Sequence, residues 1–221
     1  MAFSTGILKY IEYTVSLLFR NVKGHDVGLF IKSPAFTNDA KLATPTLVTT
    51  SPDCGPSPAM LKVEYTQFHT PPAAVKMPSL TWDLPAEMQE NVKEYILLCE
   101  DPDAPSFSKT PSLHGLWYGI PGNVRSVRPE DFVVKEESDG GACSLQGGFR
   151  LGKNRRGTVY TPPRPLLEHG PHRYFFELVA LSKPLELGGL SHRATKAELE
   201  KECVGKVLAW GVWEGSFENK W

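Results

Sequence analysis

Two patterns of apolar and polar positions divide the chain. In the first twenty residues, apolar side chains recur every three or four positions, which places them on one face of a helix. They are Ile7, Leu8, Ile11, Val15 and Leu18. The spacing predicts an amphipathic helix over residues 4–22, with Gly24 as its C-cap.

This helix is too short and too polar to cross a bilayer, because Lys9 and Glu12 interrupt its apolar run. No small-residue cleavage pattern follows it, so we expect no secretory leader. The apolar stripe has three candidate partners: the domain's own core, a second copy of the chain in a homodimer, and a membrane surface in peripheral contact. The sequence leaves these alternatives open.

A different pattern begins near residue 45, where short apolar runs are separated by Pro, Gly, Asp and Asn. Such runs are typical of a sandwich of many β-strands. The predicted strands are residues 46–50, 61–66, 80–82, 94–100, 116–120, 174–181 and 207–217. The run from Tyr95 to Cys99 is continuously apolar, which predicts a central strand buried on both faces.

One late helix is also specified. Thr195 and Glu198 have the spacing of a capping box, in which each side chain satisfies the other residue's backbone N–H. Leu199 and Cys203 then face the core, and Gly205 ends the helix. The sequence therefore predicts a mainly β protein: an N-terminal amphipathic helix over residues 1–26, and a sandwich domain of about eight strands over residues 27–221 with the late helix outside it.

Composition and charge narrow the choice of partners. The 221 residues include 24 Lys and Arg against 25 Asp and Glu, for a formal net charge of -1. A protein held on nucleic acid by charge has a basic excess, so we expect no nucleic-acid partner. The four cysteines, at positions 54, 99, 143 and 203, are too widely spaced for a zinc signature. We therefore expect no metal, no cofactor, and free thiols in a reducing, cytoplasmic compartment.

The densest polar cluster, D-P-D-A-P at residues 101–105, directly follows the predicted central strand. Its prolines stiffen the backbone that carries Asp101 and Asp103. We expect a cis bond at Asp101–Pro102 or, preferably, at Ala104–Pro105. The alternative interpretation is a turn that merely ends a strand.

Two histidines, His114 and His172, each open a later apolar run. Either one alone is typical of a structural histidine, but strand ends are where sandwiches place ligand loops. Together with the aspartates they predict a compact polar pocket that holds an anion through N–H donors or moves a proton. Tyr160 and the adjacent prolines would add a wall, and Arg155 or Arg156 a cationic rim, although these arginines also suit a solvated loop.

These segments resemble the two signatures of the phosphatidylethanolamine-binding proteins, a family that includes the Raf-kinase inhibitor proteins. Residues 101–105 followed by His114 match the first signature, and P-P at residues 162–163 followed by G-P-H-R-Y at residues 170–174 matches the second. G-K-V-L-A at residues 205–209 resembles the family's final strand. The resemblance covers roughly residues 27–217, and residues 79–82 and 153–157 are most similar to fungal members.

The resemblance implies a two-sheet antiparallel sandwich with Greek-key connections and a small pocket for phosphate, acetate, cacodylate or a phospholipid headgroup. The pocket residues that it implies are Asp101, Asp103, Pro105, His114, His172 and Tyr174. Ser112 stands where a tryptophan commonly precedes the histidine, and Tyr160 and Thr161 replace glycines. These departures imply a cavity of different shape.

Two functions follow as expectations. The first is a binding or regulatory module for a small anion or lipid headgroup, with Arg156 and Tyr160 beside the pocket residues named above. The alternative is a fungal biosynthetic enzyme that couples or cyclises reactive maleic-anhydride-type polyketide intermediates. In that scheme His114 or His172 is the base, Asp101 fixes its tautomer, and Tyr174 or Arg156 meets the developing negative charge. No nucleophile motif of a hydrolase is present.

Overall fold

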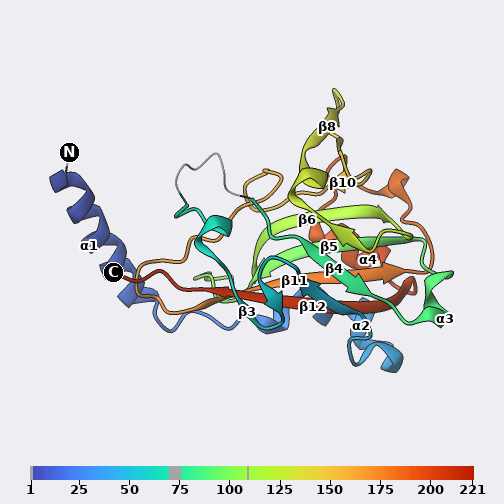
Figure 1. Ribbon diagram of the computed structural model, residues 1–221, viewed down its shortest axis with the longest axis horizontal. Helices are drawn as coiled ribbons and strands as arrows, with labels where there is room; N and C mark the ends of the chain where they lie inside the picture. The colour runs from blue at the N-terminus through green and yellow to red at the C-terminus, as the bar shows by residue number, and fades with distance from the viewer. Residues whose placement is uncertain (1, 70–75, 109) are drawn as a thin grey trace.

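Two β-sheets pack face to face in the computed structural model, which describes residues 2–69, 76–108 and 110–221 (Figure 1). The small sheet has the order β2 (Gly55–Pro56), β1 (Val48–Ser51), β4 (Leu80–Asp83) and β7 (Ser126–Val127). The large sheet has the order β3 (Ala59–Met60), β12 (Val207–Phe217), β11 (His172–Leu181), β5 (Glu94–Asp101), β6 (Ser112–Pro121), β10 (Arg150–Leu151), β9 (Cys143–Leu145) and β8 (Val134–Glu137). The predicted mainly β sandwich is confirmed. All the strand pairs are antiparallel except β3 with β12.

Helices lie outside the sheets. The α-helices are α1 (Ala2–Phe19), α2 (Pro34–Thr37), α3 (Ala86–Gln89) and α4 (Lys196–Glu202). The 3-10 helices are η1 (Asp26–Gly28), η2 (Phe30–Lys32), η3 (Ala40–Leu42), η4 (Val63–Tyr65), η6 (Pro129–Phe132) and η7 (Leu187–Gly189). The capping box predicted for α4 is confirmed: Thr195 and Glu198 cap each other's backbone, and Leu199 and Cys203 are fully buried.

The central strand β5 is buried on both faces, as its continuous apolar run predicts. Leu97 and Cys99 face the core between the two sheets. Ile96 and Leu98 face a second core on the other side of the large sheet, which residues 29–42 and α4 cover. Period-two alternation explains this division, because successive side chains of a strand point to opposite faces.

Some strand predictions are wrong in detail. Residues 61–66 contain η4 instead of a strand, because Leu61 and Tyr65 are buried four positions apart, which suits a helical turn better than alternation. The described part of the chain contains twelve strands instead of about eight. The additional strands include β2, β3, β7 and β10, which are two residues long and too short to show a periodic pattern.

Helix α1 extends away from one end of the sandwich (Figure 1). Tyr10 and Tyr13 contact Trp221, and Ser16 is buried. The face of α1 that contacts the rest of the protein is therefore marked by these three residues, which are three positions apart. The predicted apolar stripe points elsewhere: Leu8 is 60% and Leu18 is 76% exposed. Of the three candidate partners for the stripe, the chain's own core is therefore excluded for Leu8 and Leu18. Among the residues that the structure describes, none of the helices has the length and apolarity needed to cross a membrane.

Candidate functional site

At one end of the core between the sheets, the inward side chains change from apolar to polar. On β5 the row Tyr95, Leu97, Cys99 continues in Asp101, and on β11 the row of Tyr174 continues in His172. Here lies a cavity of about 210 Å³. Its lining residues are Gln67, Asp101, Ala104, Pro105, His114, Arg155, Arg156, Thr161, Pro162, Arg164, Leu166, His172 and Tyr174.

His114 reaches the cavity because of a β-bulge. Cys99 pairs with Gly115, but the next residue of β5, Glu100, pairs with Leu113, so His114 is an extra residue on β6. A bulge re-aims side chains relative to the regular alternation. Without it, His114 would share the opposite face of the sheet with Leu116.

The neighbours of His114 hold the bulge in place. Its carbonyl accepts hydrogen bonds from the backbone N–H of Thr161 at 2.8 Å and from Nδ2 of Asn154 at 2.9 Å. Gly115 has no room for a side chain, since a Cβ there would lie 2.1 Å from the Trp117 ring. The loop after β10 thus fixes where the imidazole points.

Asp101 has both carboxylate oxygens occupied. Oδ1 accepts the backbone N–H groups of Asp103 at 2.8 Å and Ala104 at 2.9 Å, and Oδ2 accepts Nδ1–H of His172 at 2.9 Å. These bonds close the turn at residues 101–104 with trans peptide bonds, so the predicted cis bond before Pro102 or Pro105 is wrong. In the described residues, the cis bond is Ser57–Pro58.

His114 is the neutral base of the cavity. Its Nδ1 contacts the carbonyl of Thr161, which only accepts, so Nδ1 carries the proton. Burial lowers the pKa of His114 despite the opposing effect of the Asp101 carboxylate, which favours the neutral ring at pH 7. Nε2 is therefore an acceptor. It lies 3.9 Å from Oδ2 of Asp101 and is buried without a hydrogen bond in the described structure.

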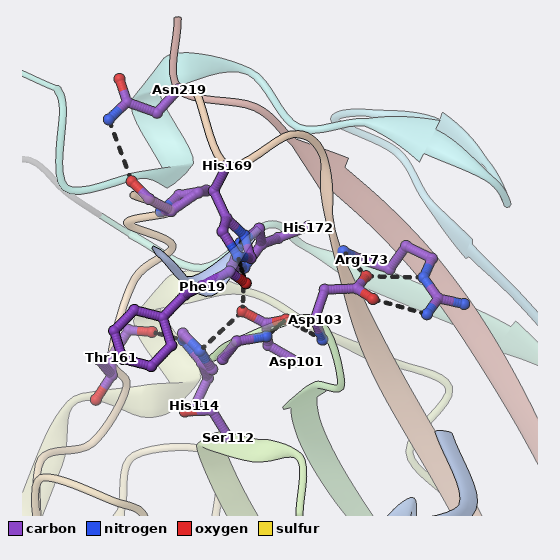
Figure 2. A network of polar contacts seen from close by, with 12 residues as sticks. Phe19, Asp101, Asp103, Ser112, His114, Thr161, His169, His172, Arg173 and Asn219 are labelled. Atoms are coloured by element: carbon purple, nitrogen blue, oxygen red, sulfur yellow. Dashed lines mark hydrogen bonds and ion pairs between the residues drawn. The ribbon is translucent and has the colours of Figure 1, made fainter. Parts of the chain in front are cut away.

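His172 is hydrogen-bonded through both ring nitrogens. Nδ1 contacts Asp101, and Nε2 lies 2.8 Å from Nδ1 of His169 (Figure 2). His169 was not predicted, although the spacing His-Gly-Pro-His was visible in the sequence. Its own Nε2 contacts the carbonyl of Phe19, the last residue of α1, at 2.9 Å.

Tyr174 offers a further polar group. Its ring meets that of His114 edge to face, with centroids 5.3 Å apart. Its hydroxyl is buried without a hydrogen bond in the described structure. Burial, and then the charge of Asp101, raise the pKa of Tyr174 well above its usual value, so the phenol stays neutral and can donate.

Cations dominate the charge at the cavity. Arg155, Arg156 and Arg164 line it together with a single carboxylate, that of Asp101. Arg155 donates to Ser112 at 3.0 Å, and Arg164 lies 3.4 Å from Glu12 of α1. The geometry therefore favours negatively charged ligands.

Two predicted ligand-binding residues do not line the cavity. Asp103 turns to Arg173, which donates to both carboxylate oxygens at 2.8 and 2.9 Å and also contacts Asp26. Burial alone would raise the pKa of Asp103, but these Arg173 hydrogen bonds hold it below its usual value. Tyr160 packs against the core instead, with its ring 6.2 Å from that of Trp117, because the space between the sheets there is apolar.

The structure brings the other predicted residues together at the cavity: Asp101, Pro105, His114, Arg156, His172 and Tyr174. Sequence reasoning missed Gln67, Arg164 and Leu166. Arg164 and Leu166 lie between the two parts of the second signature, which is a signal that could have found them, whereas Gln67 comes from a loop distant in sequence. No group of three or more metal-ligating side chains is found in residues 2–69, 76–108 and 110–221.

Comparison with known proteins gives one family. The model described as "Phosphatidylethanolamine-binding protein" matches residues 33–218. Two relatives carry the name phomoidride biosynthesis cluster protein B. One, from a fungal species, is 46% identical over 217 residues, which are 98% of this chain and 98% of the relative. The other, from Talaromyces stipitatus, is 45% identical over 215 residues, 97% of this chain and 84% of the relative. The solved structure of E. coli YbcL is similar in fold, with a TM-score of 0.61 at 20% identity, covering 78% of this chain and 98% of that chain.

Proposed function

Because the chain belongs to the phosphatidylethanolamine-binding protein family, we propose that its polar cavity binds a small anion that carries more than one negative charge. The observation that carries this proposal is the charge of the lining: three arginines against one carboxylate. Guanidinium groups bind phosphate and carboxylate oxygens through paired N–H donors. A singly charged ligand would leave part of this donor set unused.

Two buried polar atoms support the same proposal. A buried polar group without a partner costs about 1–3 kcal/mol, so a ligand that supplies the partner gains affinity. The Tyr174 hydroxyl can donate to a ligand oxygen, whereas Nε2 of the neutral His114 accepts. This combination fits an anion that keeps one O–H group and still carries two negative charges, such as hydrogen phosphate.

The size of the cavity limits the ligand. A volume of about 210 Å³ is below the roughly 300–1,000 Å³ of pockets that hold drug-sized ligands. Phosphate, a short dicarboxylate or a phosphate headgroup fits this volume. The acyl chains of a phospholipid do not, so a lipid would place only its headgroup inside.

Calorimetric titrations with inorganic phosphate, phosphoethanolamine and maleate test the proposal and separate these sources of the anion. We expect saturable binding of at least one of them, weakened about tenfold in Arg156→Gln through the loss of charge-assisted hydrogen bonds. Arg150→Gln is the matched control, because Arg150 is exposed and lies outside the cavity. Equal affinities in the two variants, or binding of none of the three anions, contradict the proposal.

A second candidate function is catalysis of coupling or cyclisation between maleic-anhydride-type polyketide monomers. The observation that favours it is that a neutral base, His114, lines the same cavity as the hydrogen-bonded pair of Asp101 and His172. In that pair, Nδ1 of His172 carries the proton. The names of the two fungal relatives, which refer to a biosynthesis cluster, support the same class of role. Fold alone does not separate a binder from a catalyst.

In this candidate mechanism, His114 is the base and His172 is not, because both nitrogens of His172 are already hydrogen-bonded. Nε2 removes a proton from the saturated carbon attached to the ring double bond of the anhydride, and the electron pair is delocalised through that double bond onto the carbonyl oxygen, beside the Tyr174 hydroxyl and Arg156. The resulting carbanion adds to the double bond of a second monomer. The imidazolium of His114 then returns the proton to the product. Thr161 fixes the tautomer of His114, a role that sequence reasoning had given to Asp101.

Incubation of the purified protein with such a monomer tests catalysis. We expect coupled product above the buffer rate, lost in His114→Ala and retained in His192→Ala, because His192 is exposed and does not line the cavity. Product formation that survives unchanged in His114→Ala, or never exceeds the buffer rate, contradicts the catalytic function. The calorimetric titrations would then still decide whether the cavity binds an anion.

A further inference from the structure

A chain of three hydrogen bonds leads from the end of helix α1 into the cavity (Figure 2). The carbonyl of Phe19 lies 2.9 Å from Nε2 of His169, and Nδ1 of His169 lies 2.8 Å from Nε2 of His172. Nδ1 of His172 then lies 2.9 Å from Oδ2 of Asp101. Both histidines are 2% exposed, so water has little access to these contacts.

The chemistry of the two ends fixes the number of protons. A backbone carbonyl only accepts hydrogen bonds, so Nε2 of His169 carries a proton. An ionised carboxylate also only accepts, so Nδ1 of His172 carries a proton. The contact between the two rings needs one more proton on either nitrogen. Two neutral histidines hold two N–H protons in total, whereas this arrangement holds three.

The surroundings indicate where the third proton resides. Burial lowers the pKa of His169, although its hydrogen bond to Phe19 has the opposite effect. The neutral ring of His169 therefore accepts from Nε2–H of His172, which becomes the imidazolium against Asp101. The C-terminal end of a helix carries partial negative charge, which also favours a net positive charge on the His169–His172 pair. Lys23 and the three arginines that line the cavity oppose this positive charge.

The backbone bends at Glu168, next to His169, and this bend positions the His169 ring. Glu168 adopts a left-handed conformation, with φ of 59°, which is costly for a residue with a side chain. The backbone N–H of Glu168 donates to the carbonyl of Asn219 at 2.8 Å, and its side chain accepts the N–H of Trp221 at 3.0 Å. The C-terminal segment thus holds the bend that inserts His169 between α1 and His172.

We propose that His169 is a positioning residue that keeps His172 doubly protonated beside the anion cavity, and that it links this charge to the docking of α1 through the carbonyl of Phe19. The inference rests on the proposed function for its consequence, because an imidazolium beside the cavity strengthens anion binding. The third proton on the His169–His172 pair is expected with or without a ligand in the cavity. His169 itself does not line the cavity.

Long-range proton–nitrogen NMR spectra of the histidine rings in the ligand-free full-length protein at pH 7 test the proton count directly. Protonated and unprotonated ring nitrogens differ in chemical shift, so each N–H is counted. We expect three N–H groups on the His169–His172 pair, and a neutral His114 that carries its proton on Nδ1. A pair with only two N–H groups overturns the inference without any variant being made.

The positioning role is tested with His169→Phe, which keeps a ring but removes both nitrogens. We expect His172 to lose its second N–H, and the affinity for inorganic phosphate to fall about tenfold because the positive charge beside the cavity is lost. His192→Gln is the control, and both measurements should match the wild type. Unchanged His172 signals and affinity in His169→Phe overturn the positioning role. Three N–H groups in a wild-type protein that binds none of phosphate, phosphoethanolamine and maleate would support the proton count and contradict the proposed function instead.

Discussion

Nε2 of His114 and Oδ2 of Asp101 lie 3.9 Å apart across the cavity, and separate elements hold each of them. The bulge on β6 and the carbonyl of Thr161 orient His114. The turn after β5 and the ring of His172 orient Asp101. An acceptor nitrogen and a carboxylate oxygen are thus held close together without a hydrogen bond between them, and both side chains line the cavity.

The first prediction concerns pH. Burial lowers the pKa of His114 in the folded state below its ordinary value of 6.5, so the unfolded chain takes up a proton first as the pH falls. The free energy of unfolding should therefore decrease from pH 7 to pH 5, by at most about 1.4 kcal/mol per pH unit for this one group. Urea titrations at several pH values should show a shallower decrease in His114→Gln than in His192→Gln. Identical pH profiles for the two variants would show that His114 is not held neutral.

The second prediction concerns a pair of buried carboxylates on the far side of the large sheet. Burial, and then the charge of Glu100, raise the pKa of Glu177 well above its usual value, and one of its oxygens has no hydrogen bond in the described structure. A raised carboxyl pKa means that stability is lost as the pH rises through the folded value. Glu177→Gln should therefore stabilise the protein against urea at pH 8, and by less at pH 5.

Glu100→Gln is the matched control for this pair. Glu100 accepts from Lys196 at 2.6 Å and from the backbone N–H of Phe30 at 2.7 Å. Loss of a charge-assisted bond in a buried site costs about 2 kcal/mol, so this variant should be less stable than the wild type. If both variants shift stability in the same direction at pH 8, this description of the two carboxylates is wrong.

The third prediction concerns the contact between Asp103 and Arg173. Asp103 is 4% exposed, and its carboxylate accepts from the backbone and the guanidinium of Arg173, whereas the side chain of Asp26, the other carboxylate partner of Arg173, is 41% exposed. Asp103→Asn should lower the free energy of unfolding by about 2 kcal/mol, and Asp26→Asn by less than about 1 kcal/mol. Thermal unfolding of both variants measures the difference. Equal losses would mean that Asp103 does not anchor the turn.

The fourth prediction concerns helix α1. Leu8 and Ile11 are 60% and 55% exposed, so replacing both by serine should change the free energy of unfolding by less than about 0.5 kcal/mol per site. Sedimentation analysis of this variant and of the wild type tests the homodimer, and vesicle flotation tests the membrane contact, the two alternatives for the stripe that the sequence left open. A large loss of stability in a monomeric protein would show that the stripe packs on the body in solution.

The structural features that depend on a local sequence pattern were predicted best. The run from Tyr95 to Cys99 indicated a strand buried on both faces, and the two apolar cores on either side of β5 confirm it. The capping box of Thr195 and Glu198 likewise acts within four residues. In both cases the physical cause lies inside the element itself, so neighbouring residues are sufficient to identify it.

The remaining features of the site depend on contacts between distant segments. The bulge that aims His114 is set by pairing between β5 and β6 and by the loop that contains Asn154 and Thr161. The contact of His169 depends on where α1 ends and how Trp221 and its neighbours hold the helix. No periodicity or spacing encodes these distances, which is why His169 was missed and Asp103 was placed in the cavity.

The central claim is that the cavity binds a small polyanion against His114 and His172. An NMR titration of the full-length protein with inorganic phosphate, following the ring nitrogens of both histidines, tests it most directly. We predict saturable shifts at Nε2 of His114 and at the nitrogens of His172, with a weaker midpoint in Arg156→Gln and an unchanged one in Arg150→Gln. Signals that stay fixed up to saturating phosphate, or that move equally for the exposed His192, would contradict the account.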